Sequence, residues 1–442
     1  MHELEPTNRS LGLVAATCLI VGQVVGIGIF LTPAEMARGL AAPGLVQAMW
    51  LLVGFMALTG ALCYGELASR MPETGGAYVF LRAAWGEPVA FLYGWKCLLV
   101  MDPGLTAALA TGLAEYAAYL TPLGSGGRKL VAVATILLLA ALAARGTRLA
   151  AGVLVLVTVL KLAVLVVVVV LGLAAGGAGA GADGGFFARD PEAPALVPAL
   201  AAGFVVAFFS FGGWWEAARM AGEVRHPART LPRAFVLGVA VVTGLYMLTS
   251  AVFMRLVPPA ESDSAEAFAA LVGERLFGEA GGAVFAAAVI VSVVGSLAAV
   301  ILLTPRTYVA LARDGLLPAR VARLHPRLGT PVTAIALQAA LAVLLVILGS
   351  FSDIVAYFVF VTVAFIALSV ASLYRLPAPA EGAFRTPLRR LTPAVFIGLC
   401  VLLLVLMLAG RPVQSLIGAI VVLLGVPVYA LFRSGMLRRE KP

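Results

Sequence analysis

Residues 21–30 of the chain read Val-Gly-Gln-Val-Val-Gly-Ile-Gly-Ile-Phe, and they interrupt an apolar segment long enough to cross a bilayer. Glycine inside a helix costs about 1 kcal/mol relative to alanine, so Gly26 and Gly28 favour local unwinding. Unwound backbone in a membrane is tolerated only where its polar groups line a cavity or meet a ligand. The stretch therefore predicts a broken membrane helix with a binding site at the break. The same glycines also fit a second interpretation, in which they only allow close helix packing.

The chemistry of such a break suits an α-amino acid. The N–H groups of Gly26, Ile27 and Gly28 would open a second half-helix, whose dipole favours an anionic group such as a carboxylate. The carbonyls that end the first half-helix, around Val24 and Val25, suit a cation. A break with donors on one side and acceptors on the other matches the two charged groups of an amino acid backbone.

The composition places the whole chain in a membrane. Its 442 residues are 62% hydrophobic and 12% charged, with a mean hydropathy of +1.04, well above the values of soluble proteins. Residues 1–10 are short and polar with no evident cleavage site, so we expect the first span to be retained. All four cysteines lie in apolar stretches without metal-ligand spacing, so neither a metal nor a cofactor is expected.

A crossing needs about 20 apolar residues, which predicts about twelve spans in an all-α membrane protein. The predicted spans are 11–40 (broken), 44–68, 86–120, 129–145, 149–175, 198–222 (broken), 234–257, 281–312, 331–350, 353–375, 392–410 and 412–432. With the N-terminus inside, 22 of the 31 lysines and arginines, Arg219 among them, are assigned to the inner side and seven to the outer side. This bias predicts that both termini are cytoplasmic. It also explains the net charge of +9 without a nucleic-acid partner.

A second interruption lies in the sixth span, where Gly212 and Gly213 sit in the middle of the membrane among aromatic residues. Spans one and six each begin a run of five spans, and two runs of an odd number of spans have opposite orientations. Matched interruptions in inverted halves are the sequence sign of a secondary transporter with a binding site at the membrane midplane. We therefore favour the binding interpretation of Gly26 and Gly28 over the packing one.

Charged residues inside predicted spans are costly and tend to mark a pathway. Lys161 lies midway along an otherwise apolar fifth span, where its ammonium could exchange a proton, replace a metal ion, or simply be satisfied by carbonyls. Asp102 is six residues from Lys96, a spacing that does not bring both to one helix face, so we expect its partner on another span. Glu216 follows the second break and is either a pathway residue or a buried pair.

Several motifs, in this order and spacing, resemble the amino acid–polyamine–organocation transporter superfamily, in particular its L-type and bacterial neutral and cationic amino acid branches. They are residues 25–33 (VGIGIFLTP), 64–72 (YGELASRMP) with 74–78 (TGGAY), 211–214 (FGGW) with 223–234, and 310–318 (ALARDGLLP) with 325–331. The resemblance implies the LeuT-like fold within one domain of residues 1–442. Its parts would be inverted five-helix repeats at 11–175 and 198–375 and two accessory helices at 390–432.

The resemblance also implies roles for individual residues. The substrate carboxylate would meet the backbone N–H groups of Gly26, Ile27 and Gly28. The amino group would meet carbonyls near Val24, Phe209 and Gly212, and the ring of Phe209 would close over the substrate. Lys161 would stand where sodium-coupled relatives hold a sodium ion. Ser210 belongs to the same predicted binding segment, and Asp102, Glu216 and Thr362 are candidate pathway residues.

Three departures from the family pattern affect these expectations. Ile27 stands where many members have serine, so a hydroxyl contact to the carboxylate is absent. Trp215 stands where eukaryotic L-type members have asparagine. The loop of residues 121–128 has no cysteine, so we expect no disulfide-linked heavy chain.

These observations predict a sodium-independent amino acid transporter of the plasma membrane that works by alternating access, either as an exchanger or as a facilitator. A neutral substrate is favoured because no intramembrane carboxylate is clearly assigned to a cationic one. Alternatives that remain open are a proton-coupled symporter and a transporter of cationic amino acids or polyamines. An ion channel lacks the expected repeated filter. An enzyme is disfavoured because the three histidines lie in predicted loops or at the terminus.

Overall fold

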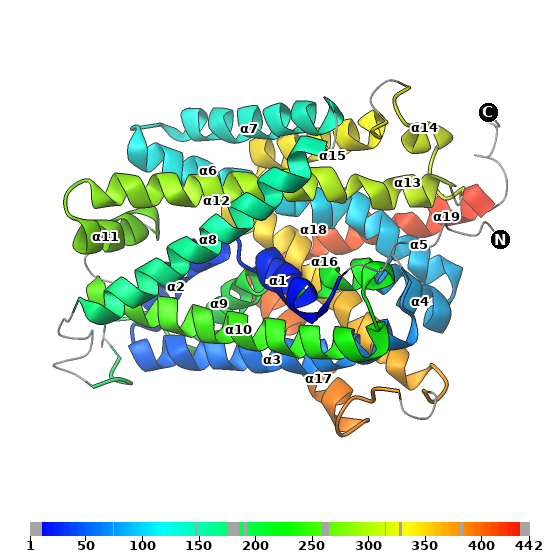
Figure 1. Ribbon diagram of the computed structural model, residues 1–442, viewed down its shortest axis with the longest axis horizontal. Coiled ribbons are helices and arrows are strands. Elements are labelled where there is room, and N and C mark those ends of the chain that lie inside the picture. The colour runs from blue at the N-terminus through cyan, green and yellow to red at the C-terminus, as the bar shows by residue number, and fades with distance from the viewer. Residues whose placement is uncertain are drawn as a thin grey trace.

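The computed structural model describes residues 11–73, 75–145, 148–175, 185–189, 192–257, 265–313, 315–326, 329–379 and 383–433. Regular structure in these ranges is helical, apart from an isolated bridge between Leu11 and Val224. The expectation of an all-α fold is therefore confirmed for these residues. The helices form a single elongated bundle with most axes along its length (Figure 1).

The helix bounds follow the apolar segments of the sequence. In chain order they are α1 (Leu13–Val24), α2 (Gly28–Leu40), α3 (Pro43–Arg70), α4 (Ala77–Trp85), α5 (Glu87–Lys96), the π-helical turn η1 (Cys97–Met101), α6 (Asp102–Leu120), α7 (Ser125–Arg145), α8 (Arg148–Ala174), α9 (Leu196–Ser210), the 3-10 helix η2 (Trp214–Glu223), α10 (Pro227–Leu256), α11 (Ala265–Phe277), α12 (Gly281–Leu303), α13 (Pro305–Arg313), α14 (Ala319–Ala322), α15 (Val332–Leu348), α16 (Phe351–Ala371), the 3-10 turn η4 (Ser372–Tyr374), α17 (Leu391–Gly410), α18 (Pro412–Leu423) and α19 (Gly425–Arg433).

Within the described ranges, nine helices are long and apolar enough to cross a membrane, and the bent pair of α1 and α2 makes a tenth candidate. The other two predicted spans coincide with α8, which has 27 residues, and with α15, which has 17. Leucines of α7 such as Leu130 and Leu138 project from the bundle, as do Val401 and Val405 of α17. Such outward-facing apolar side chains are suited to contact with lipid rather than water.

Helices from the two predicted halves pack against each other in antiparallel pairs. Gly54 of α3 faces Thr243 of α10, whereas Gly65 further along α3 faces Pro232 near the start of α10. A Cβ atom on either glycine would lie within 3 Å of its neighbour, so the missing side chains let the two backbones approach. Figure 1 shows α3 and α10 side by side along one face of the bundle.

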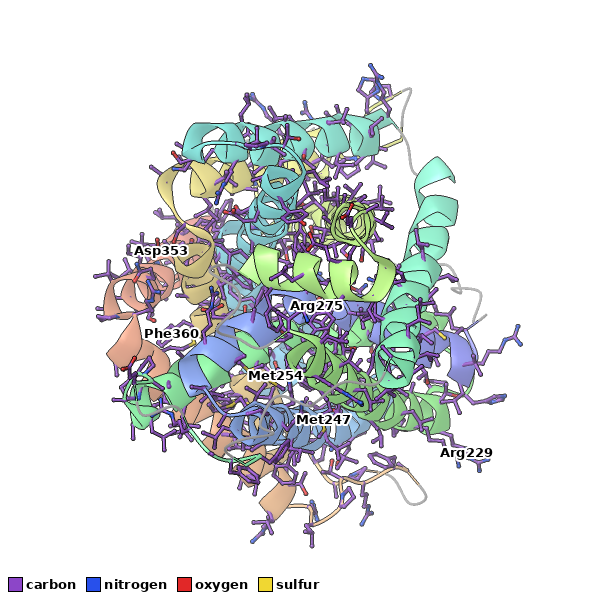
Figure 2. The ribbon with its side chains drawn as sticks, turned by 90° about the vertical axis from the view of Figure 1, so that its left-hand side faces the viewer. Arg229, Met247, Met254, Arg275, Asp353 and Phe360 are labelled. Atoms are coloured by element: carbon purple, nitrogen blue, oxygen red, sulfur yellow. The ribbon has the colours of Figure 1, made fainter. Side chains whose placement is uncertain are left out.

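The same reversal holds between α6 and the continuous segment of α12 and α13. Asp102 at the start of α6 contacts Tyr308 of α13, whereas Tyr119 at its end lies over Gly282 at the start of α12. On α10, Arg229 lies at the edge of the molecule, while Met254 near the other end is buried (Figure 2). Helix α1 packs on α10 and α2 packs on α9, while Val14 and Cys18 of α1 remain exposed.

Candidate functional site

The first interruption lies where the sequence predicts it. Helix α1 ends at Val24 and α2 begins at Gly28, and the two helices are bent by 50°. Val25 caps α1 in an extended conformation with a ψ angle of 93°. The first N–H groups of any helix have no acceptor within their own helix, so the start of α2 presents backbone donors at the break.

The two glycines of this break have different surroundings. A Cβ atom on Gly28 would lie 2.6 Å from the Oγ atom and 2.7 Å from the Cα atom of Ser210 on α9. A Cβ atom on Gly26 would meet one atom within 4 Å, the carbonyl oxygen of Val24 at 3.8 Å. Gly28 is therefore required for packing against α9, and the space beside Gly26 is not filled by another helix.

The second interruption lies directly against the first. Helix α9 ends at Ser210, and η2 starts at Trp214 after a turn in which Gly213 has a φ angle of +111°. This left-handed conformation favours glycine. A Cβ atom on Gly213 would also lie 2.9 Å from the carbonyl oxygen of Gln23. Because Gly28 faces Ser210 and Gln23 faces Gly213, the two interrupted segments run antiparallel and meet at their breaks.

Tyr246 of α10, which sequence reasoning missed, joins the two breaks. Its hydroxyl lies 3.0 Å from the carbonyl oxygen of Val24 and 3.1 Å from that of Ser210, the last residues of α1 and α9. Both carbonyls have lost their usual helical acceptor role because their helices end there. A buried tyrosine hydroxyl needs a hydrogen-bond partner. The position of Tyr246 in the middle of the seventh predicted span could therefore have indicated that it bonds to a neighbouring helix.

Side chains at the start of α2 complete this junction. The Oγ1 atom of Thr32 donates to the carbonyl oxygen of Gly28 and lies 2.8 Å from the Oγ atom of Ser210. The Ser210 hydroxyl is also 3.1 Å from the carbonyl oxygen of Val206. The side chain of Ile27 is buried against Gly112 of α6. Of the predicted binding residues, Ser210 and Ile27 therefore have side chains already engaged with the protein.

Lys161 of α8 lies beside the end of α1. Its Nζ atom donates to the carbonyl oxygen of Gly22 at 2.6 Å and to the Oγ atom of Ser296 at 3.3 Å, and the residue is only 3% exposed. In an uninterrupted helix, the Gly22 carbonyl would accept the N–H of Gly26 four residues later. The break removes that geometry, and the ammonium of Lys161 supplies a donor and a positive charge at the C-terminal end of α1.

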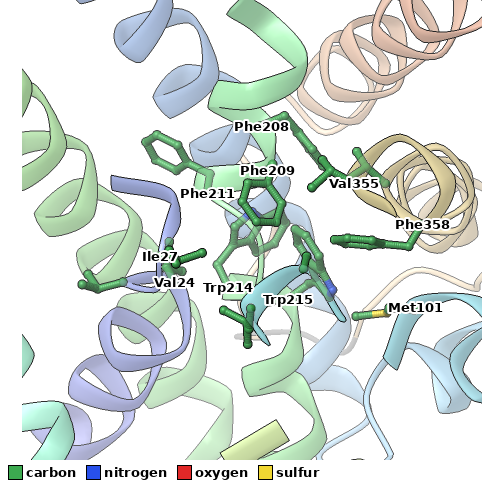
Figure 3. Packing of buried hydrophobic residues seen from close by; sticks show 14 of the residues in the cluster. Val24, Ile27, Met101, Phe208, Phe209, Phe211, Trp214, Trp215, Val355 and Phe358 are labelled. Atoms are coloured by element: carbon green, nitrogen blue, oxygen red, sulfur yellow. The ribbon is translucent and has the colours of Figure 1, made fainter. Parts of the chain in front are cut away.

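Aromatic rings surround the second break. Phe209 makes edge contacts with Phe351 and Phe358 of α16, at centroid distances of 5.7 and 6.1 Å. Phe208 stacks on Trp215 at 6.0 Å with an interplanar angle of 14°. Figure 3 shows the rings of Phe208, Phe209, Phe358 and Trp215 together with Met101, opposite Val24 and Ile27 across the junction. Phe209 therefore lies between the break and α16, as a residue that closes over the site must.

The candidate pathway residues lie on the η2 side of the breaks. The carboxylate of Asp102 accepts a hydrogen bond of 2.7 Å from Tyr308 of α13, which confirms the expected partner on another span. Glu216 forms a 2.6 Å ion pair with Arg219. Arg219, which was counted with the inner-side charges, has a largely buried side chain that reaches from η2 toward Tyr93.

Thr362 of α16 is the remaining candidate. Its Oγ1 atom is buried and has no hydrogen-bond partner among the described residues. It lies one helical turn beyond Phe358 and so shares a face of α16 with it. Within the described part of the chain, no group of three or more His, Cys, Asp or Glu side chains could hold a metal ion. The polar groups described at the breaks are backbone groups, hydroxyls, the Lys161 ammonium and the ion pair of Glu216 with Arg219.

Comparison with known proteins gives a consistent result over nearly the whole chain. Residues 11–432 match the family model described as amino acid permease. The human large neutral amino acids transporter small subunit 2 is 28% identical, with 98% of this chain and 82% of the relative covered. The serine/threonine exchanger SteT of Bacillus subtilis is 27% identical, with 98% of each chain covered. The mouse Asc-type amino acid transporter 1 is 27% identical, with 98% and 82% covered. The chain thus belongs to the amino acid permease family.

Proposed function

We propose that this permease is a sodium-independent exchanger of neutral amino acids that works by alternating access. The observation that carries the proposal is the difference between the two glycines of the first break. Close packing on Ser210 explains Gly28 but not Gly26, beside which the nearest atom to an added Cβ lies at 3.8 Å. A substrate carboxylate bound by the N–H groups of Gly26, Ile27 and Gly28 accounts for both the break and this space.

The substrate's amino group binds on the opposite side, at carbonyls of Val24, Phe209 and Gly212. The Val24 carbonyl oxygen has two lone pairs, so it can accept from the substrate as well as from Tyr246. The ring of Phe209 occludes the bound amino acid, a role supported by its position between the break and α16. Because the carboxylate and the amino group of the substrate are both held where the two breaks meet, a bound substrate couples the movements of α1 and η2.

Lys161 acts as a fixed cation, and this makes the transporter independent of sodium. Its ammonium lies 2.6 Å from the Gly22 carbonyl oxygen, where it stabilises the end of α1 without a bound ion. Because Lys161 is covalently attached, no ion gradient drives the cycle, and exchange of one amino acid for another is the expected mode. Proton coupling through Lys161 is the alternative that a gradient experiment separates from this one.

A neutral substrate is supported by the charges near the site and by the relatives. Glu216, the carboxylate nearest the second break in sequence, is paired with Arg219 and offers little net attraction to a cationic side chain. The human relative is named for large neutral amino acids and the bacterial relative for serine and threonine. All the relatives compared are transporters, which supports transport rather than enzymatic catalysis.

The fold proposed for this cycle has twelve crossings, with α8 and α15 as the fifth and ninth. Residues 11–175 and 198–375 form two inverted repeats, and residues 390–432 form two accessory helices. The antiparallel contacts of α3 with α10 and of α6 with α12 support this inverted relation, as do those between the two broken segments. In such a fold one repeat bundle rocks against the other around a fixed site.

We further propose that both termini face the cytoplasm from the cell membrane. Figure 1 shows α4, α14 and α19 at the same end of the bundle. These helices carry Arg82, Arg320 and Arg433, as the excess of positive charge on the inner side requires.

The proposal can be tested by binding measurements on purified protein. The experiment compares alanine with ethylamine, which lacks the carboxylate, and with propionate, which lacks the amino group. We expect saturable binding of alanine, no comparable binding of ethylamine or propionate, and an alanine affinity that is unchanged when sodium is replaced by choline. Binding of ethylamine as strong as that of alanine would contradict a carboxylate site at the first break.

A further inference from the structure

We propose that Trp215 forms the end of the site that receives the substrate's side chain. Its bulk restricts transport to small amino acids, and its indole N–H selects those with a side-chain hydroxyl, namely serine and threonine. This inference rests on the proposed amino acid exchange and adds the class of amino acid exchanged.

The position of Trp215 links it to the second break. It is the second residue of η2, and its Cη2 atom lies 3.7 Å from where a Cβ atom on Gly212 would stand. Phe208 stacks on one face of the indole, and Trp214 meets it edge-on at 5.5 Å. These contacts fix the ring beside the backbone that is proposed to hold the substrate's amino group, where the side chain of the same substrate must also lie.

The space around this ring is confined by other large side chains. Figure 3 shows the indole of Trp215 between Phe209, Phe358 and Met101. Phe358 in turn fills the space beside Gly104 of α6, since a Cβ atom on that glycine would lie 2.7 Å from the Cβ atom of Phe358. A substrate side chain that enters among these rings and Met101 must therefore be small, so a one- or two-carbon side chain fits more readily than that of leucine or phenylalanine.

The polar atoms of this region favour a hydroxyl. Trp215 is 6% exposed, and its Nε1 atom is buried with no hydrogen-bond partner among the described residues. Leaving a buried donor unpaired is costly, so the indole N–H is suited to an acceptor on the substrate. The Oγ1 atom of Thr362, on the same face of α16 as Phe358, is also unpaired. A substrate hydroxyl can accept from the indole N–H, and its own proton can be donated to Thr362.

The test separates bulk from hydrogen bonding with two substitutions. Proteoliposomes loaded with unlabelled alanine are assayed for exchange of labelled serine, threonine, alanine, 2-aminobutyrate, leucine and phenylalanine. Trp215→Phe keeps most of the ring but removes the N–H, and Trp215→Ala removes both. Trp95→Phe is the matched control, because the indole N–H of Trp95 is already bonded to the carbonyl oxygen of Val421 at 2.9 Å.

The wild type should prefer serine to alanine and threonine to 2-aminobutyrate, and it should exclude leucine and phenylalanine. Trp215→Phe should lower both hydroxyl preferences about tenfold, as expected for one hydrogen bond, without admitting leucine. Trp215→Ala should raise leucine exchange at least tenfold relative to alanine, and Trp95→Phe should change neither ratio. Wild-type exchange of leucine equal to that of serine, or unchanged preferences in Trp215→Phe, would overturn the inference. If the wild type exchanges none of these amino acids, the proposed function itself is wrong.

Discussion

Alanine substitutions at the two glycines of the first break separate packing from binding. In Gly28→Ala the new methyl would stand 2.7 Å from the Cα atom of Ser210, whereas ordinary contacts begin at 3.4 Å. Helices α2 and α9 must therefore separate by about 0.7 Å, the difference between these two distances. Overpacking of this kind costs about 1–3 kcal/mol, and it also strains the hydrogen bond between Thr32 and Ser210. We expect Gly28→Ala to lower the melting temperature of the protein clearly.

Gly26→Ala should leave stability nearly unchanged, because its methyl meets only the Val24 carbonyl oxygen at 3.8 Å. The methyl would instead occupy space beside the N–H groups proposed to bind the substrate carboxylate. Loss of one hydrogen bond to a charged group costs about 1.5–3 kcal/mol, which weakens binding by roughly tenfold to a hundredfold.

The assay pairs thermal unfolding in detergent with binding of labelled alanine for each variant. Wild-type affinity in a normally folded Gly26→Ala protein would refute the carboxylate site and leave packing as the explanation of the break. Wild-type stability in Gly28→Ala would show that the close approach of α2 to α9 is not needed for folding.

Three other substitutions test single contacts. Lys161→Ala removes the donor to the Gly22 carbonyl and should slow exchange at least tenfold, equally in sodium and in choline. Exchange by the wild type that is faster in sodium than in choline would contradict the fixed-cation role. Tyr246→Phe removes the hydroxyl that joins the two breaks and should destabilise the protein by about 1–3 kcal/mol, which a denaturation series would measure. An unchanged midpoint would show that this hydroxyl does not hold the breaks together. Arg219→Leu leaves the largely buried Glu216 unpaired and should destabilise the protein by up to about 3 kcal/mol. Adding Glu216→Leu should restore much of the lost stability, and a double substitution that does not recover would argue against the pair.

The glycines that the sequence singled out lie beside helix ends because their effect on the backbone is local. Gly26, Gly28, Gly212 and Gly213 weaken helices within apolar segments, and the helix ends at Val24 and Ser210 lie beside them. What each glycine contacts is a tertiary property. The sequence therefore did not distinguish Gly28, which packs on Ser210, from Gly26, which does not.

Residues that act between helices were harder to predict. Lys161 was identified because a lysine in an apolar span is costly, but its partner, the Gly22 carbonyl, depends on how α8 crosses α1. Tyr246 was missed because one tyrosine in a membrane helix is common. The partner of Arg219 was not predicted because charge counting ignores pairing, although its spacing of three residues from Glu216 fits an ion pair on one helical face.

The most direct test of amino acid exchange is uptake of labelled alanine into liposomes that contain the purified protein. Vesicles are either empty or loaded with unlabelled alanine, and each set is measured with and without an inward sodium or proton gradient. Rapid uptake that requires internal alanine and ignores both gradients is the predicted result. Uptake into empty vesicles that follows a proton or sodium gradient would contradict an exchanger in which Lys161 is a fixed substitute for a driving ion.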